Sequence, residues 1–361
     1  MKVNLDFVQP SLRPESEIMY LGENIVNREL QMRHYEDVTV VPYQGVFRSD
    51  GAFIDESFLH PNHRLPKSFR APDGYDQTIP EAVYIGMFIN IWGHCLTDCM
   101  KHLWPVLVGD GRFKTLPLVW VKSRERMNVF DNFWKMLELL GVDMGHVRQI
   151  TTPAKVEKLW IPDPCFFTDE RNYQRLCTPE YGRLFDKIIS AVPQISDAPE
   201  KIYFTRTALK VHNRDYGEKS IERIFSKKGY RIYSPETLTL ERTIGLLKGA
   251  SFFACTDGSI AHNALFMSKG SQLVIIRKAD TVNSYQSPIN QVKDLNVTFI
   301  DSHWSKFLYN NRAPWDGPFF IYPSARLKRW AGVRIANFPL KDLARYLYDA
   351  LGARIKARLG L

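Results

Sequence analysis

The chain has 361 residues, of which 45% are hydrophobic and 13% aromatic, and its formal net charge is +9. The composition argues against an extended disordered chain. The chain is longer than most domains built on a single hydrophobic core, so we expect two packed domains. The basic charge favours an anionic partner, but no nucleic-acid-binding signature accompanies it, which argues against nucleic acid. Five cysteines without CxxC spacing argue against a disulfide framework and a zinc cage, and favour buried free thiols.

The N-terminal segment does not resemble a targeting signal. It reads MKVNLDFVQPSLRPES, without the continuous apolar stretch of a secretory leader, and nowhere do eighteen apolar residues run together. We therefore expect a cytoplasmic protein. Residues 1–80 contain many prolines and little periodicity, and we assign no elements to them.

The rest of the first half is typical of an α/β domain. The segment AVPQISDAPE at 191–200 carries two prolines among small polar residues, which suits an interdomain linker. We therefore assign residues 1–195 to an N-terminal domain. Its predicted helices lie near 92–107, 129–140 and 180–191, and its predicted strands at 116–121 and 159–161.

The second half alternates short apolar strands with helices of about ten residues, a pattern that predicts a parallel sheet covered on both faces. We assign residues 196–335 to a Rossmann-like domain. Its predicted strands are 201–205, 230–233, 251–255 and 272–276, and its predicted helices are 218–228, 240–248 and 259–268.

The last segment, residues 336–361, predicts an amphipathic basic helix. From Ser324 onward nine Lys or Arg residues oppose two Asp, a surplus of seven positive charges. We favour a terminal helix that packs on the body and exposes a basic face; contact with an anionic membrane is the alternative. The apolar stripe consists of Leu340, Leu343, Leu347, Leu351, Ile355 and Leu359.

The first chemistry-bearing segment is WGHCLTDCMKH. His94, Asp98 and His102 are spaced by four, which on one helix would align three ionisable side chains. A carboxylate beside an imidazole suits a general base with an orienting partner, or two metal ligands. The alternative is an ordinary helix with one polar side.

The second segment follows the strand at 201–205. Ligands bind beyond the carboxyl ends of strands in open α/β sheets, and a cationic loop there suits phosphate. Arg206 is the best candidate for a diphosphate clamp, because a guanidinium can hold two phosphate oxygens at once. Lys210, His212 and Arg214 follow it, and the alternative is a solvated basic loop.

The third segment, CTDGSIAHN, joins a strand end to a glycine turn and the start of a helix. Such a turn directs backbone N–H groups and a helix dipole at an anion. Asp257 and Ser259 could instead cap the helix. A hydrolase triad of Ser259, His262 and Asp257 is disfavoured because no GxSxG elbow is present.

Several fingerprints are absent. The chain has no GxGxxG, no GxxxxGK[ST] and no DxD pair, which argues against NAD enzymes, P-loop enzymes and metal-dependent sugar transferases. We therefore expect no metal and no cofactor.

Four segments together resemble a known family. They are GHCLTDCMKHLW, KIYFTRT, GYRIYSPETLTL and ASFFACTDGSIAHNALFMSKGSQLVII, and the resemblance covers about residues 84–277. In order and spacing they are similar to glycosyltransferase family 61, the DUF563 group. That family includes plant xylan arabinosyl- and xylosyltransferases, animal O-linked GlcNAc transferases and many bacterial polysaccharide enzymes, and the chain looks like a bacterial polysaccharide-type member.

The resemblance implies a GT-B-like fold, in which two Rossmann-like domains face each other across a cleft and a C-terminal helix returns to the N-terminal domain. It implies inverting transfer without a metal, a donor site in the C-terminal domain and Asp98 facing the acceptor. At two places the sequence departs from the family pattern, so the nucleotide base and the sugar of the donor are not predicted. Many relatives carry His-Gly-Ala-Gly where this chain has residues 257–260, and Glu-Gln where it has Arg242-Thr243.

We therefore expect transfer of a sugar from a nucleotide-sugar donor, with UDP-linked sugars as one candidate, to a glycan or lipid-linked glycan acceptor in surface polysaccharide biosynthesis. Asp98 is the expected base, with His94 as orienting group and second choice. The alternatives are a non-catalytic glycan- or nucleotide-binding relative and, disfavoured by the missing GxGxxG, a nucleotide-sugar epimerase. The expected donor-binding residues are Thr205, Arg206, Lys210, Glu236, Asp257, Gly258, Ser259, His262 and Asn263.

Overall fold

The computed structural model describes residues 1–59, 69–209, 215–304 and 317–359. The chain folds into two compact units, one built from Met1–Glu23 and Pro193–Leu361 and the other from Asn24–Val192. Each unit combines helices with a β-sheet, so the α/β class predicted from the sequence is confirmed. The first 23 residues, which we expected in the N-terminal domain, group instead with the C-terminal half.

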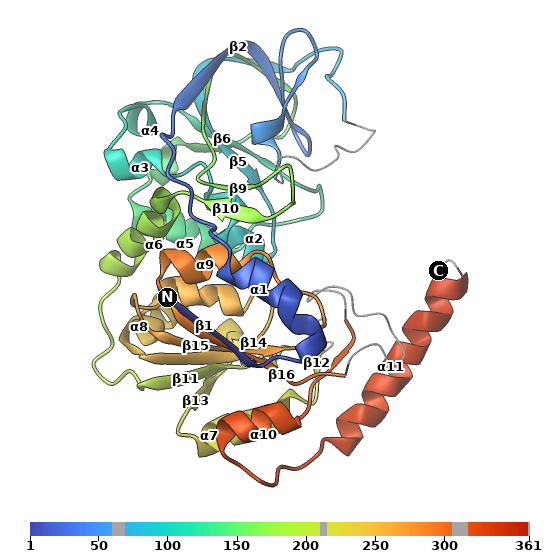
Figure 1. Ribbon diagram of the computed structural model, residues 1–361. Coiled ribbons are helices and arrows are strands. Elements are labelled where there is room, and N and C mark those ends of the chain that lie inside the picture. The colour runs from blue at the N-terminus through green and yellow to red at the C-terminus, as the bar shows by residue number, and fades with distance from the viewer. Residues whose placement is uncertain (60–68, 210–214, 305–316, 360–361) are drawn as a thin grey trace. The chain divides into compact units, whose positions relative to one another are not determined.

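The unit that contains residues 193–361 is built on a six-stranded sheet in which every neighbouring pair is parallel (Figure 1). In spatial order the strands are β1 (Lys2–Phe7), β16 (Asn296–Asp301), β15 (Gln272–Arg277), β14 (Phe252–Thr256), β11 (Lys201–Phe204) and β13 (Arg231–Tyr233). From β11 the chain first adds β13 on one side of that strand. It then crosses to the other side and adds β14, β15 and β16 in turn. This order creates a switch point between the two strands that meet there, β11 and β14.

Helices cover both faces of this sheet. On one face, α7 (Glu218–Lys227) and α10 (Ala325–Ala331) pack over alternate strand residues such as Tyr203 and Ala254. The opposite face is covered by α8 (Leu240–Gly249), the 3-10 helix η6 (Ala261–Phe266) and α9 (Gln286–Val292) (Figure 1). Since both faces are buried, the strands are apolar along nearly their whole length, which explains why their positions could be predicted.

The predicted strands and helices of this half agree with the structure to within one residue, apart from one helix. Residues 259–268 form no α-helix; they contain the shorter 3-10 helix η6 instead. At the other edge of the sheet, β1 was not predicted. It pairs with β16, and the ring of Tyr20 in α1 (Arg13–Leu21) stacks on Phe299 with centroids 3.9 Å apart.

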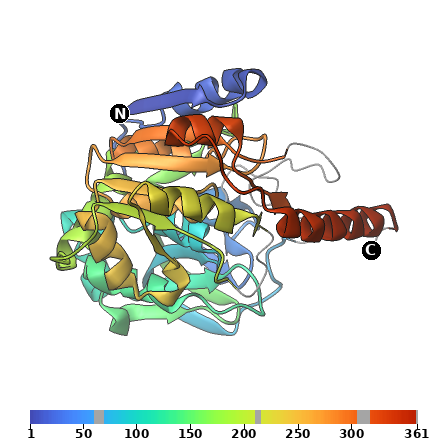
Figure 2. The same cartoon turned by 90° about the horizontal axis from the view of Figure 1, so that it is seen from below.

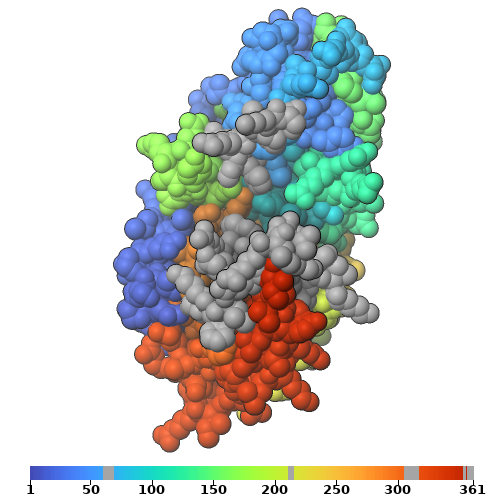
Figure 3. All heavy atoms as spheres, turned by 90° about the vertical axis from the view of Figure 1, so that its right-hand side faces the viewer, coloured from blue at the N-terminus to red at the C-terminus, as the bar shows by residue number. Residues whose placement is uncertain are grey.

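The C-terminal helix α11 (Leu340–Leu359) follows α10 and packs only in part. Tyr346 and Ala350 are buried against Phe320, which lies in β17 (Phe319–Phe320), the partner of β12 (Asp215–Tyr216). Leu351 and Ile355 are about half exposed, and the helix projects from its unit (Figure 2). In Figure 3 the C-terminal residues, in red, lie at the surface of the face that is viewed. The predicted helix therefore exists, but only part of its apolar stripe is covered. Within the described ranges, no helix is long and apolar enough to cross a membrane.

The unit of residues 24–192 contains a mixed seven-stranded sheet. Its strands β8, β5, β6 and β7 are parallel, whereas β2, β3 and β4 extend the sheet with antiparallel pairs. The helices α5 (Asp131–Leu140) and α6 (Pro179–Ala191) pack against each other. In spatial order the strands are β4 (Phe53–Ile54), β3 (Gly45–Phe47), β2 (Met32–Val41), β8 (Ala154–Pro162), β5 (Gln77–Phe88), β6 (Leu118–Lys122) and β7 (Val147–Gln149).

The prediction of one helix at 92–107 is wrong. This segment forms α2 (Trp92–Leu96), a 3-10 turn at Asp98–Met100 and α3 (Pro105–Val108). Thr97 leaves the helical region at φ −115° and ψ −88°, and its hydroxyl lies 2.9 Å from the Gly93 carbonyl oxygen. A side chain that bonds to the preceding turn competes with the helix, and a proline later removes another N–H donor.

All five cysteines are buried free thiols, as the sequence predicts.

Candidate functional site

Two loops meet at the switch point of the six-stranded sheet. Thr205 and Arg206 directly follow β11, and Asp257 and Gly258 directly follow β14. Since these strands are parallel neighbours, with Phe204 opposite Cys255, the two loops lie side by side at the carboxyl edge of the sheet. This is where open α/β sheets bind ligands.

Arg206 is fixed at its inner end and partly exposed. Its Nε lies 3.3 Å from Oδ2 of Asp215, and 25% of its side chain is accessible to solvent. Its backbone N–H donates to Oε2 of Glu218 at 3.2 Å. Lys278, at the end of β15, also pairs with Asp215. A guanidinium has five N–H donors, so an anchored arginine can still hold an anion on its outer side.

Glu218 changes the charge of this cluster. Burial, helped by the charge of Asp215, raises the pKa of Glu218 to about 8, and the Tyr203 hydroxyl lies 3.1 Å from its Oε1. The carboxyl group therefore keeps its proton to a higher pH than a free glutamate and adds less negative charge beside Arg206 and Lys278. A weaker negative charge near these two cations favours an anionic ligand.

The side chain of Thr205 is buried and bonds to Glu222 rather than to the charged groups around Arg206. Its hydroxyl donates to Oε1 of Glu222 at 2.5 Å, and the hydroxyl of Thr207 donates to the same oxygen at 2.7 Å. Glu222 thereby fixes the start of the loop that carries Arg206.

The turn after β14 is built around Asp257. Its Oδ1 accepts the Gly258 N–H at 2.6 Å and the Asn283 amide at 3.1 Å, and burial raises the pKa of its carboxyl group. The Gly258 N–H is therefore engaged, contrary to the expectation from sequence. The N–H groups of Ser259 and Ile260 have no acceptor among the described residues, and Gly258 adopts φ +115°, which favours glycine. An anion at this turn would meet two N–H donors.

The other predicted donor-site residues differ in exposure. His262 and Asn263 are buried in η6, where the Asn263 amide donates to the Ile260 carbonyl oxygen at 2.8 Å and holds the turn. Glu236 is exposed in a 3-10 turn (Pro235–Thr237) after β13. Lys210 lies outside the described residues.

In the unit of residues 24–192, two members of the predicted ionisable row are in contact. Nδ1 of His94 lies 2.6 Å from Oδ2 of Asp98, and the Thr97 hydroxyl lies 3.1 Å from the same oxygen. The His94 side chain is 23% exposed, whereas that of Asp98 is 3% exposed. The carboxylate therefore sits behind an imidazole that faces outward, an arrangement that orients the ring and fixes its tautomer.

His102 does not join this pair, because the predicted continuous helix is broken. Its two ring nitrogens lie 2.6 and 3.0 Å from the carbonyl oxygens of Pro162 and Glu56, and burial lowers its pKa to about 3. Burial likewise lowers the pKa of Lys101 to about 8, and its Nζ donates to the carbonyl oxygen of Phe58. Both side chains hold backbone segments together inside the unit.

The buried charges around Arg206 were not predicted from the sequence. Asp215 and Lys278 come from β12 and from the end of β15, which are far apart in the chain, and Glu218 resembles an ordinary first-turn residue of α7. Charged residues directly after apolar strands were the available signal. Within the ranges that the structure covers, no three His, Cys, Asp or Glu side chains form a group that could hold a metal ion.

Comparison with known proteins identifies the family of this chain. The family described as Glycosyltransferase 61 matches residues 92–274, just over half of the chain and a range that holds both the His94–Asp98 pair and the switch-point loops. No curated protein matches the chain significantly. The chain belongs to the glycosyltransferase 61 family and is a glycosyltransferase.

Proposed function

We propose that this protein transfers a sugar, with inversion, from a nucleotide-sugar donor to a glycan acceptor in surface polysaccharide biosynthesis. In this proposal the two units are the domains of a GT-B transferase, and UDP-linked sugars are the first donors to test. The observation that carries the proposal is the cationic switch point, where the loop with Arg206 lies beside the turn at Gly258.

The donor diphosphate would bind at this point. The exposed part of Arg206 would take phosphate oxygens from one side, and the N–H groups of Ser259 and Ile260 would take them from the other. The raised pKa of Glu218, which reduces the negative charge beside Arg206, supports the same assignment.

The acceptor hydroxyl would be activated by the pair in the other unit. We assign the base to His94, oriented by Asp98, which reverses the roles expected from sequence. The reason is burial, since a carboxylate 3% exposed behind a ring 23% exposed is better placed to orient than to meet a substrate. When Nδ1–H donates to Asp98, Nε2 is the basic nitrogen.

In the proposed step, the acceptor oxygen attacks the anomeric carbon from the face opposite the diphosphate. His94 Nε2 takes the hydroxyl proton, and the bond between the anomeric carbon and the diphosphate oxygen breaks with its electron pair on the leaving group. Cationic and N–H groups at the switch point would stabilise the charge that develops on the diphosphate. No metal or cofactor is required by this scheme.

We also propose that α11 contributes peripheral contact with an anionic membrane at the cytoplasmic face. The half-exposed Leu351 and Ile355 on a basic helix support this assignment.

A thermal-shift screen across nucleotide sugars tests the proposal, because a ligand that binds only the native state must raise the unfolding temperature. We expect one nucleotide-sugar class to stabilise the protein and the matching nucleoside diphosphate to compete with it. Transfer to a glycan acceptor should then persist in EDTA. Loss of transfer in EDTA that is restored by Mn²⁺ or Mg²⁺ would refute the metal-free scheme, and no stabilisation by any nucleotide sugar would refute the donor assignment.

A further inference from the structure

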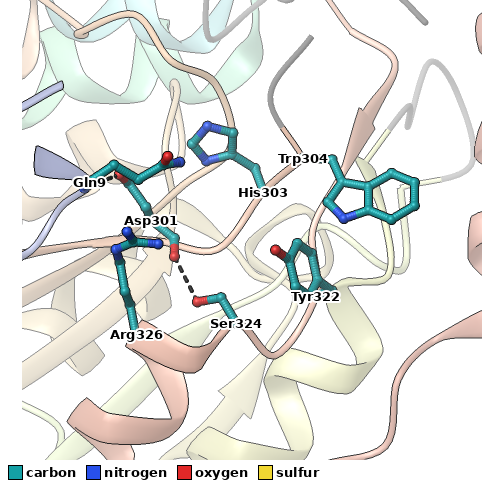
Figure 4. Close-up of a pocket in the computed structure, with 7 residues that line it drawn as sticks. All are labelled: Gln9, Asp301, His303, Trp304, Tyr322, Ser324 and Arg326. Atoms are coloured by element: carbon teal, nitrogen blue, oxygen red, sulfur yellow. Dashed lines mark hydrogen bonds between the residues drawn. The ribbon is translucent and has the colours of Figure 1, made fainter. Parts of the chain in front are cut away.

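A separate pocket lies at the other side of the same sheet edge. It has a volume of about 310 Å³ and opens beyond the carboxyl ends of β16 and β1 (Figure 4). Two strands separate β16 from β11, so at the usual strand spacing the pocket is roughly 14 Å from the switch point. It is lined by Gln9, Asp301, His303, Trp304, Tyr322, Ser324 and Arg326.

The inner wall of this pocket is tightly bonded. Oδ1 of Asp301 lies 3.2 Å from Nη1 of the buried Arg277, and Oδ2 accepts the backbone N–H of Gln9 at 2.6 Å. The hydroxyl of Ser324 donates to the backbone carbonyl oxygen of Asp301 at 2.7 Å. Asp301 is only 2% exposed and its charge is matched by Arg277, so this carboxylate offers little to a ligand.

The remaining acidic neighbour is also engaged. Oδ1 of Asp280 lies 3.0 Å from Nε2 of His303, whose Nδ1 lies 3.0 Å from the Arg277 carbonyl oxygen. Both carboxylates near the pocket therefore have a basic partner within the protein.

Three polar groups of the lining are not used by the protein itself. The guanidinium of Arg326, the hydroxyl of Tyr322 and the side-chain amide of Gln9 have no hydrogen-bond or ion-pair partner among the described residues. Figure 4 shows Arg326 and Gln9 on one side of the pocket and the Tyr322 hydroxyl directed toward that side. Trp304 and Tyr322 add aromatic walls, with ring centroids 6.3 Å apart and planes at 71°.

This set of groups defines a ligand class. A guanidinium group prefers a carboxylate as its partner. Phenol and amide groups can form hydrogen bonds with hydroxyl groups. Aromatic faces pack against the C–H face of a sugar ring. The volume is at the lower end for ligand pockets, enough for one monosaccharide. We propose that this pocket binds a single acidic sugar, a pyranose that carries a carboxylate, as a unit of the acceptor glycan. The inference rests on the proposed glycan acceptor.

Calorimetric titration with free glucuronate, and with glucose as the neutral analogue, tests this binding directly. We expect glucuronate to bind and glucose to bind at least tenfold more weakly. Arg326→Gln should weaken glucuronate binding about ten- to a hundredfold, as expected for a lost charge-assisted hydrogen bond. Arg329→Gln is the matched control: it changes the same residue type on α10, but Arg329 is exposed and bonds to the Asp6 carbonyl oxygen, so the affinity should not change.

An acidic oligosaccharide that binds more tightly than glucuronate would identify the ligand as a glycan unit, and equal affinities would identify it as the free sugar. The inference is overturned if glucuronate does not bind the wild-type protein, if Arg326→Gln leaves its affinity unchanged, or if inorganic phosphate displaces it at equal concentration. The failures are separable. Nucleotide-sugar binding without glucuronate binding would sink only this inference, whereas glucuronate binding that depends on Arg326, without any nucleotide-sugar binding, would sink the proposed transfer.

Discussion

Lys278 and Asp215 form an ion pair in which Nζ lies 3.2 and 3.1 Å from the two carboxylate oxygens, and each side chain is only 3% exposed. The same carboxylate also holds Nε of Arg206 at 3.3 Å. The buried carboxylate of Asp215 thus pairs with two cations, Lys278, which is almost inaccessible to solvent, and Arg206, which is partly exposed.

Asp215→Asn should lower the free energy of unfolding by about 3–5 kcal/mol, because it leaves the charge of Lys278 buried without its partner. Urea denaturation at neutral pH measures this. The double variant Asp215→Asn with Lys278→Met should recover part of the loss, since it removes both charges. A double variant less stable than the single one would contradict this account.

Glu218→Gln should become more stable relative to the wild type as pH rises from 4.5 to 8. The folded protein keeps a proton on Glu218 up to a pKa of about 8, whereas the unfolded chain loses it near 4.5. Wild-type folding therefore takes up a proton within this window, and its stability falls as pH rises. The amide preserves the neutral group, with its oxygen toward the Arg206 N–H and its nitrogen toward the Tyr203 hydroxyl. Urea midpoints at pH 5 and pH 8 check the trend, and a difference independent of pH would contradict it.

Arg206→Ala should weaken binding of the nucleoside diphosphate about ten- to a hundredfold, the usual effect of losing a charge-assisted contact. Calorimetry with the nucleotide found in the donor screen measures it. Arg231→Ala is the control, because Arg231 is exposed at the start of β13, at the amino ends of the parallel strands, whereas Arg206 lies at their carboxyl ends. If the two variants bind equally well, the diphosphate site lies elsewhere.

His94→Ala should reduce turnover by about 10²- to 10⁴-fold, the usual contribution of a general base, while donor affinity stays the same. Added imidazole should restore part of the activity, since a small base can fill the space left by the ring. Asp98→Asn should also slow turnover but should gain nothing from imidazole. An active His94→Ala variant together with an inactive Asp98→Asn variant would return the base to Asp98.

Gly217→Ala should destabilise the protein more than Gly229→Ala. Both glycines have positive φ, +94° and +82°, so both variants carry a left-handed strain of about 1–2 kcal/mol. A Cβ on Gly217 would also overlap the Ile321 carbonyl oxygen, whereas nothing lies within 4 Å of the corresponding atom on Gly229. Overpacking adds roughly 1–3 kcal/mol. Thermal unfolding of the two variants checks the order, and equal losses would contradict the overlap.

The sequence predicts most accurately the strands that are buried on both faces. In β15 the run QLVII between Gly270 and the charged end of the strand leaves little ambiguity, and β11 and β14 are similar. β1 is different, because it lies at an edge of the sheet and only one of its residues, Leu5, is buried. Its identity as a strand depends on β16, which no local pattern could show.

The sequence predicted several residues of the candidate site but not the contacts that hold them in place. Spacing by four correctly paired His94 with Asp98 but also included His102, because the break at Thr97 depends on a side-chain bond to the preceding turn. Arg206 was found from its place after a strand. Its anchor, Asp215, lies in a two-residue strand that exists only through pairing with Phe319 and Phe320.

The pairing of β1 with β16 also sets an order of events during synthesis. Lys2 faces Asn296, so the first strand emerges from the ribosome nearly three hundred residues before its partner. At elongation rates of about 5–20 residues per second, it waits roughly 15–60 s. During that time the apolar side chains of β1 have no partner strand, and the six-stranded sheet is complete only after β16 has been made.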